Sequence, residues 1–289
     1  MRPSNLTNAD AELERLDVAR VSPSTRTRPT ASAQSRAVGA LRRHWLPLTA
    51  AAFVTALYLL PHMIQASRGY GGAMLIQEDE PFYVARFARA LQGTPSASPL
   101  IYEHRDELSI LPGFVERALA APFRGLAALG VTLPSAAAIV TVYRALFTFI
   151  GVLCMSFAFT SVGMGSVLAT LATLWAYVDP GLLFYKPLLG AVITNQVFDR
   201  FPNPAVSLPI LFFGWGSVAR VVLSATPASS ASAHLRTHAR WVASAGISGG
   251  LLFYISFYYW TLFIAVLALT ALIDLRRLYA AAIAVGALA

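Results

Sequence analysis

Long apolar runs separated by shorter polar stretches recur along most of the chain, and this pattern predicts helices that cross a membrane. The first apolar run covers about 45–66, and the second, 136–160, follows a more polar stretch. Two shorter runs come next, about 166–178 and 205–222. We expect each of these four segments to form a membrane-spanning helix.

The last long apolar stretch, 241–273, contains 33 residues without a charge. A single helix of that length would be roughly 50 Å long, whereas the hydrocarbon core of a bilayer is roughly 30 Å thick. We therefore expect two spans, about 241–257 and 260–273, joined by a tight turn near 258–260. The final apolar residues, 278–289, are expected to begin a seventh helix, so that the sequence is truncated at its C-terminus.

The composition favours an all-α polytopic membrane protein. Hydrophobic residues make up 56% of the chain and charged residues 12%, about half the charged fraction of a soluble domain. The 22 Lys and Arg residues, all arginine except Lys186, give a net charge of +8, but they gather in the N-terminal tail and beside apolar runs. Cations placed in this way orient a protein in a membrane, so nucleic acid is not expected as a partner. Cys154 is the only cysteine, which excludes an internal disulfide.

The chain divides into a polar tail, 1–44, and a transmembrane domain, 45–289. The tail is rich in Ser, Thr, Arg, Pro and Ala, a composition typical of disorder. Arg36, Arg42 and Arg43 precede the first span. Because positive charges flanking a span stay on the inner side, we expect the tail to lie in the cytoplasm.

The loop between the first two spans, 67–134, then lies outside and holds seven of the fourteen acidic residues. One helix in this loop is expected to begin at Pro81 and to end near Gln92. A second helix, roughly 113–129, is expected to be interrupted at Pro122. The first helix has an apolar face that suits the membrane surface. That face carries Val84, Phe87 and Leu91.

An acidic run, Glu78-Asp79-Glu80, opens the loop, and Tyr83 follows it. A cytoplasmic tail, one span, a large outer loop with an acidic pair near its start and many further spans resemble the multi-pass glycosyltransferases of the GT-C fold, such as the mannosyl- and aminoarabinose-transferases. Weaker likenesses lie in Arg200-Phe201-Pro202-Asn203-Pro204, Leu252-Phe253-Tyr254 and Tyr258-Tyr259-Trp260. The resemblance implies a helical bundle whose large first outer loop carries juxtamembrane helices, and a sugar donor linked to polyprenyl phosphate.

In that family a carboxylate in the outer loop, close after the first span, is the catalytic base, and by position Asp79 or Glu80 matches it. The base would accept the acceptor's proton while the anomeric carbon is attacked from the face opposite the leaving phosphate. Alternatively, the acidic run only caps the helix that begins at Pro81, where the helix dipole stabilises a carboxylate by about 0.3–1 kcal/mol. The sequence leaves both interpretations open.

A second acidic group follows in the same loop. Carboxylates are hard oxygen ligands, so this group could bind a divalent cation that bridges the protein and the donor phosphate. The alternative is a solvated face of the loop, and we assign neither a metal ligand nor a definite cofactor. The group comprises Glu103, Asp106, Glu107 and Glu116.

Arg200 and Lys186 lie at the outer interface in this topology, where they are candidates for binding the donor phosphate or merely extend toward the interface. Arg144 lies about eight residues into the second span, roughly 12 Å at 1.5 Å per residue. A charge at that depth is costly unless it faces other helices, water or a partner. We expect it to form a structural ion pair with Asp179.

The expected function is that of a membrane-embedded inverting glycosyltransferase, which moves a sugar from a polyprenyl-phosphate carrier to a lipid, glycan or protein acceptor at the outer face. The alternatives are a multi-pass transporter or lipid flippase, and a non-catalytic scaffold. A transporter would concentrate its polar groups within the spans, whereas here the outer loop holds most of them. Abundant Arg and Ala with a single Lys indicate a GC-rich genome, and hence the inner membrane of a bacterium.

Overall fold

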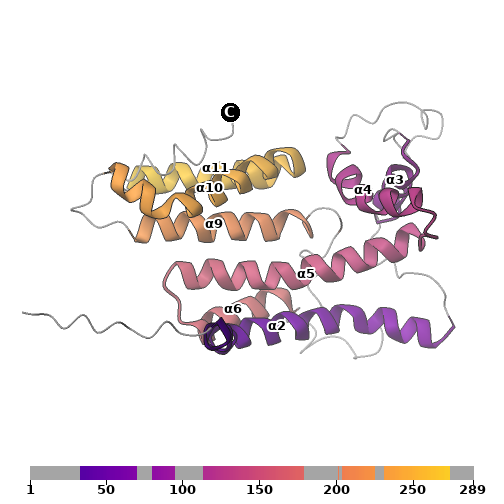
Figure 1. Ribbon diagram of the computed structural model, residues 1–289, viewed down its shortest axis with the longest axis horizontal. Coiled ribbons are helices and arrows are strands. Elements are labelled where there is room, and N and C mark those ends of the chain that lie inside the picture. Colours follow the sequence, from indigo (N-terminus) through magenta and orange to yellow (C-terminus); the bar gives the residue numbers. More distant parts are fainter. Residues whose placement is uncertain are drawn as a thin grey trace, which may run out of the picture. The chain divides into compact units, whose positions relative to one another are not determined.

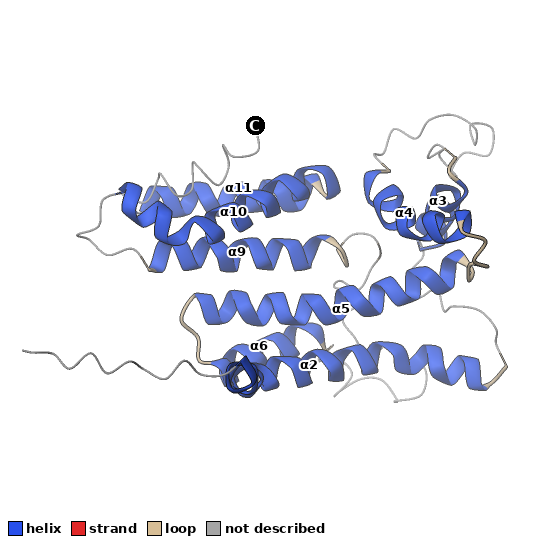
Figure 2. Ribbon diagram, in the orientation of Figure 1, coloured by secondary structure: helices blue, strands red, loops and turns tan. Residues whose placement is uncertain are grey.

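The computed structural model describes residues 33–69, 80–94, 113–178, 201, 204–224 and 231–273. Every regular element in these residues is an α-helix (Figure 2), which confirms the all-α class. The chain divides into two compact units, Met1–Arg43 and His44–Ala289. All contacts described below lie within the second unit.

The described part of the chain forms α2 (Ala33–Ser67), α3 (Glu80–Gln92), α4 (Phe114–Ala128), α5 (Ala136–Ser161), α6 (Ser166–Tyr177), α9 (Ser207–Leu223), α10 (Ala231–Ile255) and α11 (Phe257–Ile273) (Figure 1). Two helices, α5 and the part of α2 from His44 to Ser67, are long and apolar enough to cross a membrane. Apolar stretches in α6, α9 and α11 are shorter.

The helices of the second unit differ in their capacity to span a bilayer. The 12 residues of α6 extend over about 18 Å, well short of a hydrocarbon core of roughly 30 Å. The 17 residues of α9 and of α11 reach about 26 Å each. Length and apolar composition together therefore support a span, among the described helices, for α2 and α5, and the further spans remain predictions.

The uncharged stretch 241–273 is divided between two helices that are separated only by Ser256. The break lies two residues before the 258–260 turn that the sequence favoured. The N–H of Ser256 donates to the Leu252 carbonyl at 2.8 Å, so the end of α10 keeps its backbone hydrogen bonding. Phe263 of α11 lies against Gly249 of α10, so α11 folds back along α10.

The most extensive packing contacts in the described residues join α9 to α5 and to α10, and α5 and α9 lie side by side (Figure 1). Gly216 of α9 lies against Phe157 and Ala158 of α5. One turn further, Arg220 Nε donates to Ser161 Oγ at 3.1 Å. Because the contacts advance in the same direction along both helices, α5 and α9 run parallel.

The helices on either side of this pair run in the opposite direction. A turn of four residues joins α5 to α6, and Ser156 Oγ of α5 donates to Thr173 Oγ1 of α6 at 3.2 Å. On the other side, α10 packs along α9, with Ser248 against Gly214. The parallel pair α5 and α9 is thus flanked by two helices, α6 and α10, that run in the opposite direction.

These helices bury small polar side chains and expose large apolar ones. The hydroxyls of Thr173 and Ser217 are buried and donate to the carbonyl four residues earlier, each at 2.8 Å. In contrast, Leu168 and Trp175 of α6 are 58% and 67% exposed, and Leu272 of α11 is 74% exposed. Small residues inside and large apolar residues outside are typical of helices packed within a membrane, whereas a soluble protein rarely exposes so much apolar surface.

Close packing of α5 against α9 predicts an unequal response to two glycine substitutions. A Cβ at Gly216 would lie 2.5 Å from the Phe157 ring and 3.2 Å from the Ala158 backbone, whereas a Cβ at Gly125 of α4 would meet nothing within 4 Å. Gly216→Ala should lower the free energy of unfolding in detergent by about 1–3 kcal/mol. Gly125→Ala should raise it by roughly 0.5–1 kcal/mol, because alanine favours helix. Equal effects of the two substitutions would show that α5 and α9 do not pack as described.

Candidate functional site

Helix α3 begins and ends where its sequence predicts. It covers Glu80–Gln92, with Pro81 in its first turn, and Gly93 ends it at a φ of 79°. The N–H of Gly93 donates to the Ala90 carbonyl at 3.1 Å, and the N–H of Thr94 donates to the Arg89 carbonyl at 3.2 Å. This pair of bonds is the Schellman arrangement, which needs a residue that tolerates positive φ at the end of the helix.

The apolar face of α3 packs against protein, so the expectation that it lies on the membrane surface is wrong. Phe87 is fully buried, and Val84 and Leu91 are partly buried beside it. The centre of the Phe87 ring lies 6.2 Å from that of the Tyr143 ring in α5 and 6.0 Å from that of the Phe201 ring. Neighbouring helices cover the face because the loop folds back onto the start of α5.

Helix α4 passes through Pro122 without interruption, contrary to the sequence expectation. Proline removes one backbone donor and crowds the preceding turn, but here the helix continues to Ala128. Its end lies one residue before the expected 129, and Gly130, whose φ is 81°, follows the C-cap residue Leu129. Tyr143 Oη of α5 donates to the Leu119 carbonyl of α4 at 2.7 Å, which ties the helix to α5.

The two loop helices run parallel to each other. Arg86 of α3 pairs with Glu116 near the start of α4, and further along, the Arg124 guanidinium lies 3.0 Å from the position that a Gly93 Cβ would take. Arg124 therefore sits over the C-terminal end of α3, where the helix dipole favours a cation. One ion pair and one dipole contact thus hold the helices in register.

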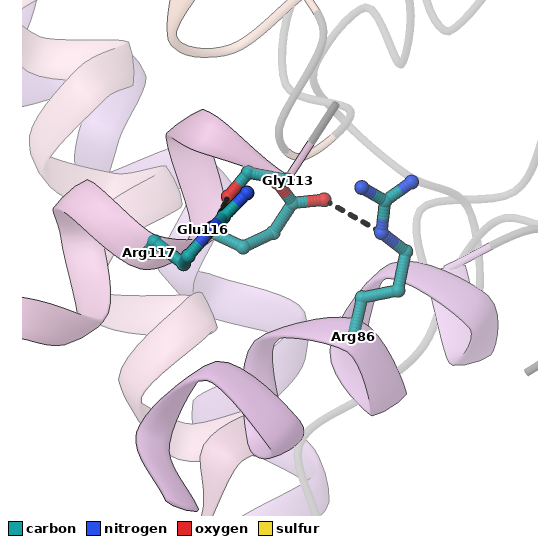
Figure 3. A network of polar contacts seen from close by, with 4 residues as sticks. All are labelled: Arg86, Gly113, Glu116 and Arg117. Carbon is teal, nitrogen blue, oxygen red and sulfur yellow. Dashed lines mark hydrogen bonds and ion pairs between the residues drawn. The ribbon is translucent and has the colours of Figure 1, made fainter. Parts of the chain in front are cut away.

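A buried ion pair links the facing sides of α3 and α4. Arg86 Nε lies 3.0 Å from Glu116 Oε1, and the two side chains are 2% and 4% exposed (Figure 3). The Arg86 guanidinium also lies 5.6 Å from the centre of the Phe82 ring. Beside the pair, Arg117 Nε donates to the Gly113 carbonyl at 3.3 Å. Glu116 therefore does not lie on a solvated face of the loop.

Burial raises the pKa of the Glu116 carboxyl above its ordinary value. The charges of Arg86 and Arg117 and a backbone hydrogen bond act in the opposite direction and only partly offset this effect. The folded protein consequently favours the neutral carboxyl more than the unfolded chain does. The stability of the folded protein therefore depends on the Arg86 partner of Glu116, because a buried charge without a partner is costly.

Sequence reasoning missed Arg86 although a signal for it exists. Arg86 lies between Tyr83 and Ala90 at helical spacing, on the side of α3 that packs inward. Glu116 precedes Leu119 and Ala120 in the same way on α4. When one amphipathic helix carries a cation on its apolar side and its neighbour carries an anion there, the two residues are expected to form a buried ion pair.

Most of the predicted site residues lie outside the described residues. Glu80 is the first residue of α3, but its side chain is outside the described part of the structure. Of the second acidic group, only Glu116 is described. The predicted site residues outside the described ranges are Asp79, Glu103, Asp106, Glu107, Asp179, Lys186 and Arg200.

The structure brings together two distant stretches that carry these residues. Phe87 lies in the helix that begins at Glu80, and Phe201 immediately follows Arg200. The two rings meet edge to face at a centroid distance of 6.0 Å. Along α3, Phe87 is seven residues from Glu80, about 10 Å. The Phe87 side chain, seven residues after Glu80, therefore packs against the side chain that follows Arg200 in the sequence.

Arg144 is buried and faces another helix, as a charge inside a span requires. Its side chain is 2% exposed, and its guanidinium carbon lies 5.2 Å from the centre of the Tyr58 ring of α2. Thr148, one turn further along α5, is also 2% exposed. The predicted pair with Asp179 stays a prediction, because Asp179 lies outside the described residues.

Within the described ranges, no three His, Cys, Asp or Glu side chains come together as a group that could hold a metal ion. The comparisons with known proteins add no family: no model of a protein family, no curated protein and no solved structure matches the chain.

Proposed function

We propose that this protein is a membrane-embedded inverting glycosyltransferase with a GT-C-like helical bundle. It would transfer a sugar from a polyprenyl-phosphate carrier to a lipid, glycan or protein acceptor at the outer face of a bacterial inner membrane. The contact between Phe87 and Phe201 is the observation that carries this proposal. In this contact α3, which begins at Glu80 of the acidic run, packs against Phe201, the residue after Arg200.

Anchoring of the loop helices supports a catalytic role for the acidic run. A carboxylate catalyses proton transfer efficiently only when its backbone is held in a fixed position. Here α3 is held by the ion pair with Glu116 and by the contacts of Phe87. Glu80 is the first residue of α3 and Asp79 precedes it in the sequence, so anchoring of α3 would limit where the backbone of Glu80 can move.

Helix directions support the proposed topology. If the tail is cytoplasmic, α5 and α9 must both run from the outer to the inner side, and their parallel packing agrees with this requirement. The loop helices contact Ile139 and Val140 at the start of α5, and they also contact Val206 just before α9. On this topology the loop helices lie at the outer end of both helices.

The proposed reaction assigns separate tasks to the acidic and basic residues. Asp79 or Glu80 accepts the proton of the acceptor hydroxyl as its oxygen bonds to the anomeric carbon. The bond from that carbon to the phosphate oxygen breaks at the same time, and polyprenyl phosphate leaves with the electron pair. Arg200 and Lys186 stabilise the departing phosphate through charge-assisted hydrogen bonds. Attack opposite the leaving group inverts the anomeric configuration.

One observation favours the alternative function of a multi-pass transporter or lipid flippase. Arg144 is buried between α2 and α5, the two helices long and apolar enough to cross a membrane. Charged residues inside spans often line transport pathways. We rank this alternative second because the other side chains buried around the α5–α9 contact are uncharged, such as Thr148, Ser156 and Leu211.

A donor assay tests the proposal. Membranes that contain the protein are given a panel of polyprenyl-phosphate sugars, and released polyprenyl phosphate is followed by mass spectrometry. We expect release from at least one donor, with inverted configuration in the product, and none from membranes that lack the protein. If no donor releases polyprenyl phosphate while the protein moves a labelled lipid between leaflets, the transporter function replaces this proposal.

A further inference from the structure

The α5, α9 and α10 helices bring together a stack of aromatic and cationic side chains at the end where α5 finishes. The rings of Phe157 in α5 and Trp241 in α10 are stacked, with centroids 5.5 Å apart and an interplanar angle of 27°. The Arg220 guanidinium carbon lies 5.8 Å from the centre of the Phe157 ring. The Arg240 guanidinium carbon lies 4.8 Å from the centre of the Trp241 ring. We call these four residues the arginine–aromatic stack.

The two guanidinium groups of the stack are exposed but held in place. Arg220 Nε donates to Ser161 Oγ at 3.1 Å, and both arginines lie against aromatic rings, which favour a cation. Arg236, one turn before Arg240, is also exposed. A cation whose side chain is already fixed loses less conformational entropy when it binds an anion.

No carboxylate accompanies these cations in the surrounding sequence. The chain contains no Asp or Glu between Glu116 and Asp179, which covers α5 and α6, and none between Asp199 and Asp274, which covers α9, α10 and α11. The helices that form the stack therefore supply positive charge without an acidic residue of their own. The surface they form has a charge complementary to an anion.

Apolar and hydroxyl groups border the stack. Val162, next to Ser161, is 56% exposed, and Leu223 of α9 is 57% exposed. Ser224 Oγ lies 3.2 Å from His238 Nε2, one turn beyond Arg220. Exposed aliphatic side chains beside fixed guanidinium groups and a hydroxyl match a molecule with acyl chains and a phosphodiester headgroup.

We propose that the arginine–aromatic stack binds the headgroup of an anionic phospholipid in the bilayer. Arg220 and Arg240 contact the phosphodiester oxygens, Ser224 and His238 contact the polar part of the headgroup, and Val162 and Leu223 contact the acyl chains. The helix directions place this surface at the end of α5 remote from the loop helices. It is therefore separate from the proposed transfer site and does not depend on sugar transfer.

Lipid titration of the purified protein tests this proposal. The protein in a nonionic detergent is titrated with dioleoyl-phosphatidylglycerol or dioleoyl-phosphatidylcholine, and bound lipid is counted by native mass spectrometry. We expect phosphatidylglycerol to bind more tightly and its binding to weaken with added salt. Arg220→Gln or Arg240→Gln should each weaken that binding by about fivefold, and both together by about 30-fold. Arg117→Gln, at an exposed arginine of α4, is the matched control and should leave binding unchanged.

Two results would overturn the assignment. The first is equal binding of the two lipids by the wild type. The second is wild-type affinity for phosphatidylglycerol in the double glutamine variant, provided that it elutes from gel filtration as the wild type does. If the double variant does not fold, the pair Arg220→Lys and Arg240→Gln replaces it, and unchanged binding in that pair also overturns the assignment. Loss of lipid binding with intact sugar transfer would separate this surface from the proposed transfer site.

Discussion

Asp79→Asn should lower the release of polyprenyl phosphate by about 10²–10⁴-fold, the contribution typical of a general base. Asparagine keeps the size of the side chain but cannot accept the acceptor's proton. The measurement is the initial rate of release by membranes that contain equal amounts of wild-type or variant protein. Asp10→Asn makes the same chemical change in the N-terminal tail and should leave the rate unchanged.

The outcome of this substitution also separates the two interpretations of the acidic run. If the run only caps α3, Asp79→Asn should cost no more than about 1 kcal/mol of stability and leave the rate per folded protein unchanged. A rate that survives the substitution would move the base to Glu80 or to the second acidic group. Of that group Glu116 is the weakest candidate, because its carboxylate is buried against Arg86.

Glu116→Ala should lower the free energy of unfolding by about 3–5 kcal/mol, because it leaves the Arg86 charge buried without its carboxylate partner. Arg86→Ala should have a similar effect, because it leaves the Glu116 carboxylate buried without its cation. The double replacement Arg86→Met with Glu116→Leu should recover most of the loss, since two apolar side chains need no partner. Denaturation of the purified proteins in detergent measures all four free energies.

Arg117→Ala is the control for the loss of a charge in the same turn of α4. Arg117 is exposed and donates one hydrogen bond to the Gly113 carbonyl, so its removal should cost no more than roughly 1 kcal/mol. If Glu116→Ala cost no more than this control, the ion pair would not hold α3 and α4 together. If the double replacement were as unstable as the single ones, the pair would have a role that apolar packing cannot replace.

Local signals in the sequence predicted most of the helix ends correctly, but α2 begins at Ala33, inside the tail predicted to be disordered, and α10 begins at Ala231 instead of 241. Pro81 and Gly93 mark the ends of α3, and Gly130 marks the end of α4, because proline suits a first turn and glycine tolerates the positive φ that follows a last turn. The interruption predicted at Pro122 was wrong, because α4 continues through this residue. The cost of a proline is a property of the helix alone, whereas α4 is also held by contacts with α3 and α5.

Contacts between distant residues could not be predicted in the same way. The Phe87–Phe201 contact joins residues 114 positions apart, and nothing local in either stretch indicates the other. The same holds for the arginine–aromatic stack, which needs three helices to pack before its rings can meet. Both the proposed transfer site and the lipid surface depend on such contacts.

The sequence by itself determined that this protein is helical and rich in apolar segments, because helical periodicity, proline and glycine act within one or two turns. Only the tertiary structure decided which side of each helix faces inward. It covered Phe87 with α5 and paired Arg86 with Glu116. It also buried several small hydroxyl side chains, such as that of Thr173, while it left large apolar side chains such as that of Trp175 exposed. That choice depends on the packing of helices against one another and on the solvent around them, and neither is encoded within a single segment.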